Sequence, residues 1–258
     1  MSHWYDSEGN PNHFAGKDGK PTTLREARKL GLYPSVTTVG QVVAKFALTN
    51  WLQEQAVLQS LYTPRARFDD IPKLAWAKRV VADAKEKTMA KADAGTDIHD
   101  VLEEFQQIGH AVLDFMGVSD EYHDMCDAVM ELIEEKTGLD FFDDFKSETR
   151  FCDTENGYAG MCDLHGEGWV IDYKSKDSVD DKTRGWPEQA EQLAAYAHGL
   201  GIPNARLANV FISRSDPTQV VWYEHRDPMA WERFRHALML WQVTKKYGPY
   251  YEGLKEQE

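Results

Sequence analysis

The chain has 258 residues, which is enough for one large domain or two small ones. Hydrophobic residues make up 42% of the chain and aromatic residues 12%, so a core can be buried, and no apolar stretch approaches the roughly 18 residues of a membrane-spanning helix. The net charge of −14, taken alone, argues against a nucleic-acid partner, because contacts to phosphate require Lys and Arg.

The three cysteines, Cys126, Cys152 and Cys162, include no C-x-x-C pair. An odd and sparse set of this kind predicts a reducing cytoplasm without a disulfide framework. It also excludes a four-cysteine iron–sulfur or zinc site, because such a site needs four thiolates. The first residues show no basic region followed by an apolar one, so we expect no secretory signal.

The N-terminal part carries two turn signals, at 7–10 and 17–20, followed by a short helical pattern at 24–30. We expect a hairpin and a small helix in this region. Pro34 prevents helix at its own position, and Ser35 with the residues after it can then cap the segment that follows.

Three longer helical patterns follow, at 41 to about 62, at about 71–107 and at about 121–136. Gly95 offers a break in the second pattern, and Thr96 can cap a new helix after it. The first half of the chain is therefore expected to be mostly helical.

The stretch 73–91 within the second pattern is the most basic of the chain. It holds six basic and two acidic side chains, a local charge of +4, so the rest of the chain carries −18. A charge run of this kind is by itself more often the solvated face of a helix. It becomes a DNA-facing surface where a nearby site cleaves phosphodiesters. The candidate DNA contacts are Lys78, Arg79, Lys85 and Lys87.

The pattern changes after residue 140 to short strands separated by turns, with one amphipathic helix among them and one at the end. The predicted strands are 145–152, 158–164, 169–174, 207–213 and 220–225. The predicted helices are 186–200 and 228–247. This order predicts an α/β sheet with a helical N-terminal half.

The chemistry concentrates in the third of these strands and the strand before it. Asp172 and Lys174 are two residues apart, so their side chains share one face of the strand. If residues 166–167 form a two-residue turn, Asp163 lies opposite Val170, on the same face as Asp172 and diagonal to it. The two carboxylates and the ammonium group would then meet on one face.

Two carboxylates are costly to place on a mostly buried sheet unless something neutralises them. A hard divalent cation such as Mg²⁺ does so, because it is typically held by one or two carboxylates together with waters and substrate phosphate. The lysine can then orient or help to deprotonate the attacking water. The alternative is an Asp–Lys ion pair on an exposed strand. An isolated D-x-K tripeptide favours the ion pair, because the motif is short. The presence of Asp163 at hairpin spacing makes the metal site a closer competitor.

Two further pairs of polar residues lie on predicted helices. His99 and Glu103 are spaced i and i+4, on one face of a helix. Gln192 and Tyr196 have the same spacing on the helix after the three strands. As isolated residues, all four are ordinary positions of amphipathic helices.

The motifs G-T-x-x-H, G-x-x-D, D-Y-K and Q-L-x-x-Y follow one another in this order between about residues 95 and 200. Each motif is short, but the four in this order resemble the RecB-like exonuclease branch of the PD-(D/E)XK nuclease superfamily. Upstream, residues 34–38 with Trp51 are similar to the entrance segment of phage and mitochondrial exonucleases of this group.

The resemblance implies a restriction-endonuclease-like core, which is a mixed central sheet flanked by helices. The whole chain, 1–258, would then be a single nuclease domain. Residues 1–140 would form a mostly helical part with an N-terminal hairpin, through which DNA enters, and residues 141–250 would form the catalytic α/β core.

The resemblance also implies roles for individual residues. Asp163 and Asp172 would bind metal, and Lys174 would be the catalytic lysine. The backbone carbonyl of Tyr173 would complete the coordination, and His99 would match the additional metal-contacting histidine of the RecB-like branch.

A second group of residues would support the site or contact DNA. Gln192 and Tyr196 match the motif with that role, and Glu148 resembles a family acid near the site. Ser35 and Thr37, in the entrance segment, are candidates for the same supporting role.

The resemblance thus implies an exonuclease that digests DNA from a free end with one or two Mg²⁺ or Mn²⁺ ions and without an iron–sulfur cluster. The chain departs from the family pattern in holding Asp172 where Glu is commoner, and in lacking the cysteine cluster of the iron–sulfur members. Its size suggests recombination or repair in a phage or mobile element, in the cytoplasm of a bacterial or phage-infected host cell.

DNA with a free end is the expected partner, a single-strand annealing or recombination protein is a candidate second partner, and no membrane partner is expected. Two alternatives stay open. One is an endonuclease or nickase on the same core, since a fold does not fix the mode of cutting. The other is a catalytically inactive module that binds DNA ends.

Overall fold

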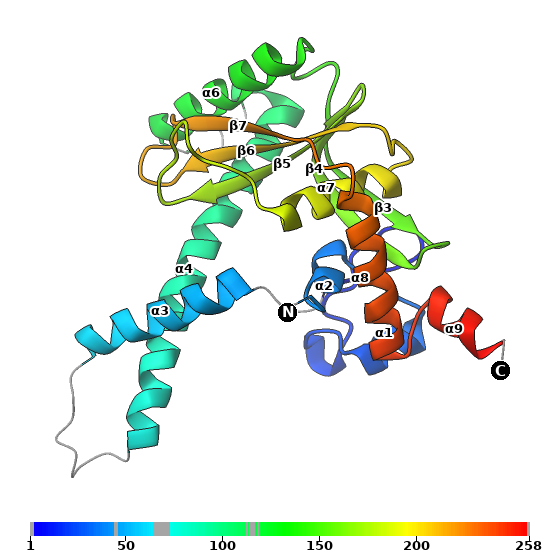
Figure 1. Cartoon of the computed structure of the whole chain (residues 1–258). Coiled ribbons are helices and arrows are strands. Elements are labelled where there is room, and N and C mark those ends of the chain that lie inside the picture. The colour runs from blue at the N-terminus through cyan, green and yellow to red at the C-terminus, as the bar shows by residue number, and fades with distance from the viewer. Residues whose placement is uncertain are drawn as a thin grey trace. The chain divides into compact units, whose positions relative to one another are not determined.

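The structure is a computed structural model that describes residues 3–43, 46–63, 73–111, 113, 117 and 119–256 (Figure 1). Within its helices, the side chains at 46–48, 73, 85 and 87–97 lie outside this description. The chain divides into two compact units, Met1–Val43 with His99–Glu258 and Ala44–Ile98. No helix among the described residues is long and apolar enough to cross a membrane.

The N-terminal part follows its sequence signals. β1 (Trp4–Tyr5) pairs with β2 (Tyr33–Pro34), and Tyr5 bridges Pro11 across the first predicted turn. α1 (Leu24–Leu30) begins with a capping box and ends at Gly31, whose φ is 65°. The predicted small helix is therefore confirmed, whereas the expected hairpin is represented by the single bridge between Tyr5 and Pro11. Two short helices flank the larger elements, η1 (Lys17–Gly19) and α9 (Pro249–Lys255).

A turn begins where the sequence pattern predicts the start of a helix at residue 41. α2 (Val36–Gly40) has Ser35 as its N-cap, and the Ser35 side chain accepts the N–H of Thr38. Gln41 is the C-cap of α2 and donates its own N–H back into that helix, so it does not start another. The next helix, α3 (Phe46–Tyr62), begins at Phe46. The cap by Ser35 is confirmed, and the predicted start at 41 is wrong.

Helix α4 (Lys73–Ile108) runs through Gly95 without a break. The predicted interruption at Gly95, with a new start capped by Thr96, is therefore wrong. A glycine inside a helix costs roughly 0.5–1 kcal/mol relative to Ala. That cost is small beside the cooperative hydrogen bonding of a 36-residue helix.

A five-stranded mixed sheet forms the centre of the larger unit (Figure 1). Its strands stand side by side in chain order: β3 (Lys146–Asp153), β4 (Tyr158–Gly166), β5 (Trp169–Lys176), β6 (Arg206–Ser213) and β7 (Val220–His225). β5 and β6 are parallel and are connected through α7 (Pro187–Gly199), whereas the other neighbours are antiparallel. The predicted strands and the mixed α/β class are confirmed.

The turn between β4 and β5 is formed by Glu167 and Gly168, not by 166–167 as the sequence predicts. Both residues have positive φ, 22° and 84°, as a type I′ turn requires. Gly166 pairs with Trp169 instead, and a Cβ atom there would lie 2.1 Å from the carbonyl oxygen of Asp144. This glycine therefore makes room for a neighbouring backbone and is not part of the turn.

The corrected register changes the neighbour of Asp163. The paired residues run from Gly166–Trp169 to Leu164–Ile171, so Val170 pairs with His165 and not with Asp163. The ladder ends before Asp163, whose carboxylate accepts the N–H of Tyr173 on β5. Asp172 and Lys174, two residues apart on β5, share one face of that strand.

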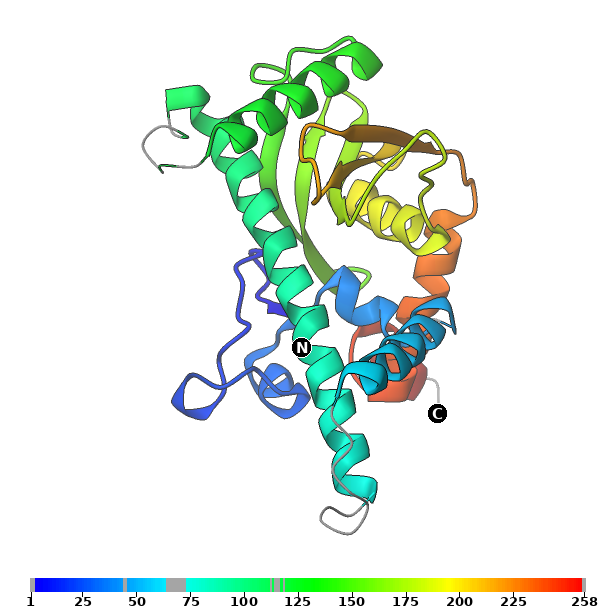
Figure 2. The same ribbon diagram turned by 90° about the vertical axis from the view of Figure 1, so that its left-hand side faces the viewer.

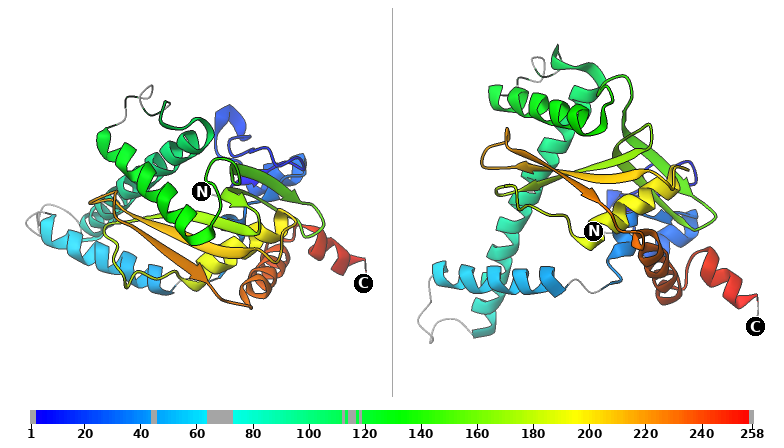
Figure 3. Two further views of the ribbon diagram at one scale, coloured as in Figure 1. Left: turned by 90° about the horizontal axis from the view of Figure 1, so that it is seen from above. Right: turned by 45° about the horizontal axis from the view of Figure 1, so that its top comes forward.

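Helices cover both faces of the sheet (Figure 1, Figure 3). α7 and α8 (Ala230–Lys245) pack together on one face, over a core that includes Val170 and Leu193. α6 (Asp120–Thr137) lies across the opposite face. The last turns of α4 run alongside the strands, where Phe105 is fully buried (Figure 2). Asp172, on the central strand β5, is therefore almost completely buried.

Candidate functional site

The site begins where β4 and β5 stop pairing. The ladder between them ends at Leu164 and Ile171. Beyond that point the N–H of Tyr173 donates to the Oδ2 atom of Asp163, at 2.9 Å. A buried backbone N–H requires an acceptor, and the Asp163 side chain supplies it. This bond holds the Asp163 carboxylate beside β5.

Asp172 is nearly inaccessible, with 1% of its surface exposed, and it is surrounded by donors. The Lys174 ammonium lies 2.5 Å from Oδ2. Asn209, from β6, donates to the same oxygen at 2.7 Å, and Gln192, from α7, donates to Oδ1 at 3.0 Å. The negative charge of Asp172 is therefore compensated by a cation and two amides.

The negative charge of Asp163 is compensated much less than that of Asp172. The nearest ring nitrogen of His99, Nδ1, is 3.4 Å from its Oδ2 atom. Among the described residues, no Lys or Arg forms an ion pair with Asp163. Burial, and then the charge of Asp172, raise the pKa of Asp163 to about 6, against the opposing effects of His99 and Lys174. The carboxylate form of Asp163 is thus held at an electrostatic cost.

Glu148 adds to this negative potential. It lies on β3 between the pairs Ser147–Leu164 and Thr149–Cys162, at the register position that faces Asp163. Its φ of 46° is unusual for a residue with a side chain. Burial, and then Asp163 and Glu103, raise the pKa of Glu148 to about 8. The structure therefore brings this predicted residue into the electrostatic environment of Asp163.

Lys174 stays charged in these surroundings. Burial opposes the ammonium form, but Asp172 and Asp163 outweigh it and raise the pKa of Lys174 above its ordinary value. The side chain keeps 28% of its surface exposed, so the ammonium group is accessible from one side.

The helix α7 supplies the predicted pair Gln192 and Tyr196, one turn apart. Gln192 Nε2 donates to Asp172 and also to the Tyr196 hydroxyl, at 2.8 Å. The Tyr196 ring is buried against Phe151. A Cβ atom at Gly160, the glycine of G-x-x-D, would lie 2.9 Å from Phe151 and 3.1 Å from Tyr196. That glycine gives the two rings the space they occupy.

The rings of Tyr173 and His99 contact each other edge-on, with centroids 5.9 Å apart. Tyr173 is buried, and its hydroxyl has no hydrogen-bond partner among the described residues. The metal-binding role predicted for its backbone carbonyl stays a prediction.

Ser35 and Thr37 serve the start of α2. Ser35 is buried, its Oγ atom accepts the N–H of Thr38 at 3.0 Å, and it lies 3.0 Å from the Thr37 hydroxyl. Its backbone bridges Ala159 on β4. Within the described part of the chain, neither residue is hydrogen-bonded to Asp163. The structure therefore gives Ser35 a capping role and Thr37 a contact with that cap, and does not join either residue to the carboxylates.

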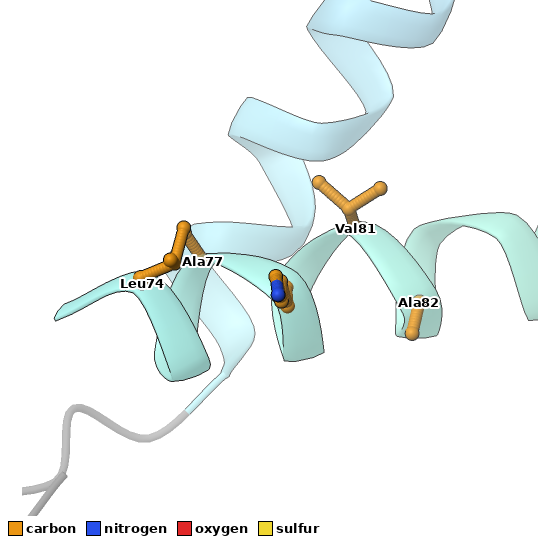
Figure 4. A pocket seen from close by; sticks show the side chains of 5 residues that line it. Leu74, Ala77, Val81 and Ala82 are labelled. Atoms are coloured by element: carbon orange, nitrogen blue, oxygen red, sulfur yellow. The ribbon is translucent and has the colours of Figure 1, made fainter. Parts of the chain in front are cut away.

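The predicted DNA contacts on α4 belong to the unit Ala44–Ile98. Lys78 and Arg79 are exposed. Lys78 lines a shallow pocket together with apolar side chains of the same helix, shown in Figure 4: Leu74, Ala77, Val81 and Ala82. The side chains of Lys85 and Lys87 lie outside the described residues. The predicted DNA-facing surface stays a prediction.

Two residues near Asp172 are absent from the sequence prediction. Asn209 is fully buried and donates both amide hydrogens to Asp172, one to Oδ2 and one to the backbone carbonyl at 3.0 Å. Its Oδ1 atom lies 2.7 Å from Nε2 of His225 on β7. Burial lowers the pKa of His225, against the pull of Asp172 and Asp227. The signal for Asn209 was a lone amide inside the otherwise apolar run 207–212.

The residues fit a hard divalent cation. Within the described residues, no three His, Cys, Asp or Glu side chains converge as a preformed metal cage. Mg²⁺ does not need such a cage, since one or two carboxylates with waters and phosphate hold it. Asp163 and Asp172 provide those carboxylates, and the raised pKa of Asp163 marks a place where a cation would be favoured.

Comparison with protein-family models and with the sequences of curated proteins gave no match to this chain. The interpretation of the site therefore rests on its residues and their geometry.

Proposed function

We propose that the protein is a divalent-metal-dependent deoxyribonuclease of the PD-(D/E)XK type, acting as an exonuclease of the RecB-like branch. One observation carries the proposal. Asp163 and Asp172 lie side by side on neighbouring strands, and the Lys174 ammonium is 2.5 Å from the second of them. The four sequence motifs, far apart in the chain, supply the side chains of this one place.

The proposed cation site would be formed by Asp163 and Asp172, with His99 and the Tyr173 carbonyl as further ligands. A bound Mg²⁺ or Mn²⁺ ion, or two, would supply a water of lowered pKa and neutralise phosphate charge. The imbalance between the carboxylates supports this assignment. Asp172 already has a cation beside it, whereas Asp163 is ionised at a cost that a divalent ion would remove.

The protein's own groups would then act on the substrate phosphate. Lys174 is held as an ammonium with one side accessible, so it is suited to stabilise the negative charge that develops on the scissile phosphate. Gln192 fixes the orientation of Asp172 through Oδ1, and its second bond, to Tyr196, restrains the amide. The site is thus organised before any substrate arrives.

The preference for DNA ends rests on the order of the four motifs, and one assay separates the candidate activities. Linear duplex, linear single-stranded and covalently closed plasmid DNA are incubated with Mg²⁺, with Mn²⁺ and with EDTA. An exonuclease digests the linear substrates in metal and leaves the closed circle intact. Cutting of the circle would indicate an endonuclease or nickase. Binding of ends without cutting in either metal would indicate an inactive DNA-end-binding module.

A further inference from the structure

The hydrogen bonds of Asp172 leave one of its oxygens full and the other partly open. Each carboxylate oxygen has about two acceptor positions. Oδ2 takes two donors, the Lys174 ammonium and the Asn209 amide. Oδ1 takes one donor from the described residues, the Gln192 amide. Among these residues an acceptor position therefore stays available on Oδ1, and Asn209 is one of the two groups that keep Oδ2 occupied.

The orientation of the Asn209 amide follows from its neighbours. A carboxylate and a backbone carbonyl only accept hydrogen bonds, so the NH₂ group must face Asp172. The carbonyl oxygen must then face His225, whose Nε2 atom lies 2.7 Å away. His225 therefore carries a hydrogen on Nε2 and donates it to Asn209. A side chain at 225 without that donor would leave the buried Oδ1 atom of Asn209 without its partner and remove one of the bonds that hold the amide in place.

The His225 ring is itself held in place from two further sides. The Tyr223 ring meets it edge-on, with centroids 4.9 Å apart. The backbone at Gly185, in the segment before α7, comes so close that a Cβ atom would lie 2.4 Å from Cε1 of His225. The imidazole thus occupies one position. From this position on β7 it donates to Asn209 on β6.

We infer that Asn209 and His225 are positioning residues for the cation site: His225 fixes the Asn209 amide, which occupies Oδ2 of Asp172 and keeps the open acceptor position on Oδ1 available to a divalent cation. The inference rests on the proposed function for the identity of the site. A purely structural role, tying β5 to β6 and β7, would affect folding stability without a specific change in cation affinity.

The test measures Mn²⁺ binding to the full chain without DNA, by the electron paramagnetic resonance of free Mn²⁺. Asn209→Leu removes the amide at similar volume, and His225→Leu removes the donor to the amide. His225→Gln keeps a nitrogen donor near the Nε2 position. Ser213→Ala is the matched control, because Ser213 is a buried polar residue of the same strand β6 that bonds to Ser215.

We expect Asn209→Leu and His225→Leu to weaken Mn²⁺ binding by about 10- to 100-fold, the range typical of groups that orient metal ligands. His225→Gln should recover most of the affinity, and Ser213→Ala should leave it unchanged. Thermal unfolding in EDTA identifies any variant that does not fold. If Asn209→Leu is such a variant, the contrast between the Leu and Gln replacements of His225 decides the question.

The outcomes separate this inference from the proposed function. Wild-type affinity in both leucine variants, equal losses in the Gln and Leu variants of His225, or no Mn²⁺ binding by the wild-type protein would each overturn the inference. A wild-type protein whose Mn²⁺ affinity depends on Asn209 but which digests no DNA would overturn the proposed function and leave the inference in place. Metal-dependent DNA digestion by the wild-type protein, together with unchanged Mn²⁺ affinity in both leucine variants, would do the reverse.

Discussion

Asp163 and Asp172 are neighbours on adjacent strands, yet the protein surrounds them in opposite ways. Asp172 is buried with a cation and two amides around it. Asp163 is bonded to one backbone N–H, faces an imidazole, and has its pKa raised to about 6 by burial and by Asp172. One carboxylate is therefore satisfied by the fold itself, whereas an added positive charge would stabilise the other. Four measurements would test this contrast.

The largest effect should come from removing the positive charges that the site uses. EDTA should abolish DNA cleavage, and Mg²⁺ or Mn²⁺ should restore it. Lys174→Ala should lower turnover by about 100-fold or more, because it removes a group placed to stabilise developing charge. Lys176→Ala is the control, since Lys176 lies on the same strand but bonds to the Arg184 carbonyl and not to Asp172. Full activity in chelator, or equal rates for both variants, would contradict the mechanism.

The second comparison replaces each carboxylate by its amide and measures unfolding in EDTA at pH 8. Asp172→Asn should destabilise the protein by roughly 3 kcal/mol, because it leaves the Lys174 ammonium without its partner. It also places a new NH₂ group against the amide donors of Gln192 or Asn209. Asp163→Asn should be neutral or stabilising by about 1 kcal/mol, because it removes the repulsion and keeps an acceptor for Tyr173. Both variants should lose cleavage. Similar destabilisation by the two substitutions would mean that the carboxylates are not distinct.

The third test uses the pH dependence of stability. Acids whose pKa is raised in the folded state contribute stability at low pH that is lost as pH rises through the folded-state pKa. Asp163, raised from 3.8 to about 6, and Glu148, raised from 4.5 to about 8, define the window. The metal-free protein should therefore lose stability, on the order of 2 kcal/mol, between about pH 4.5 and pH 8.

The double variant Asp163→Asn with Glu148→Gln provides the reference for that measurement. Its unfolding free energy in EDTA should change less over the same pH window than that of the wild-type protein. Saturating Mn²⁺ should also flatten the wild-type profile, because a bound cation favours the ionised carboxylates. Parallel profiles for wild-type and double variant would show that the slope comes from other groups.

The smallest expected effect concerns the basic stretch of α4, which belongs to the unit Ala44–Ile98 and not to the unit that holds Asp163 and Asp172. Replacing Lys78, Arg79, Lys85 and Lys87 by Gln should weaken DNA binding and flatten its salt dependence, by about 0.9 in the log–log slope for each duplex phosphate that the protein no longer neutralises. Turnover at saturating DNA should change little. DNA affinity measured at several salt concentrations for the parent and the quadruple variant checks this. Indistinguishable slopes would mean that the stretch is a solvated helix face and that DNA enters elsewhere.

Local sequence was informative where one physical rule dominated. The strands of the sheet follow from alternation and turn residues, and the α/β class follows from their order. The turn between β4 and β5 could not be placed, because Gly166 and Gly168 flank Glu167 and either could serve. Only the packed structure reveals that Gly166 is needed for the close approach of Asp144. Local sequence does not record such a long-range contact.

The site shows the same division. Asp172 and Lys174 could be placed on one face of their strand from spacing alone, and the structure brings Gln192 to Asp172 and His99 to Asp163 across long stretches of chain. Asn209 could not be assigned, because its function depends on the parallel register of β5 and β6, which sets it beside Asp172. A parallel neighbour arrives through a crossover, and nothing in the local pattern of either strand fixes that register.

The exposed turn at Glu167 and Gly168 is a place where the chain can be lengthened. The register of β5 does not depend on this turn alone, because β5 pairs along its whole length with β6 and buries Val170 and Ile171. Residues inserted between Glu167 and Gly168 should therefore extend the loop and leave Asp172 and Lys174 on their face of the strand. This hairpin is thus a suitable point for attaching a tag or a second domain.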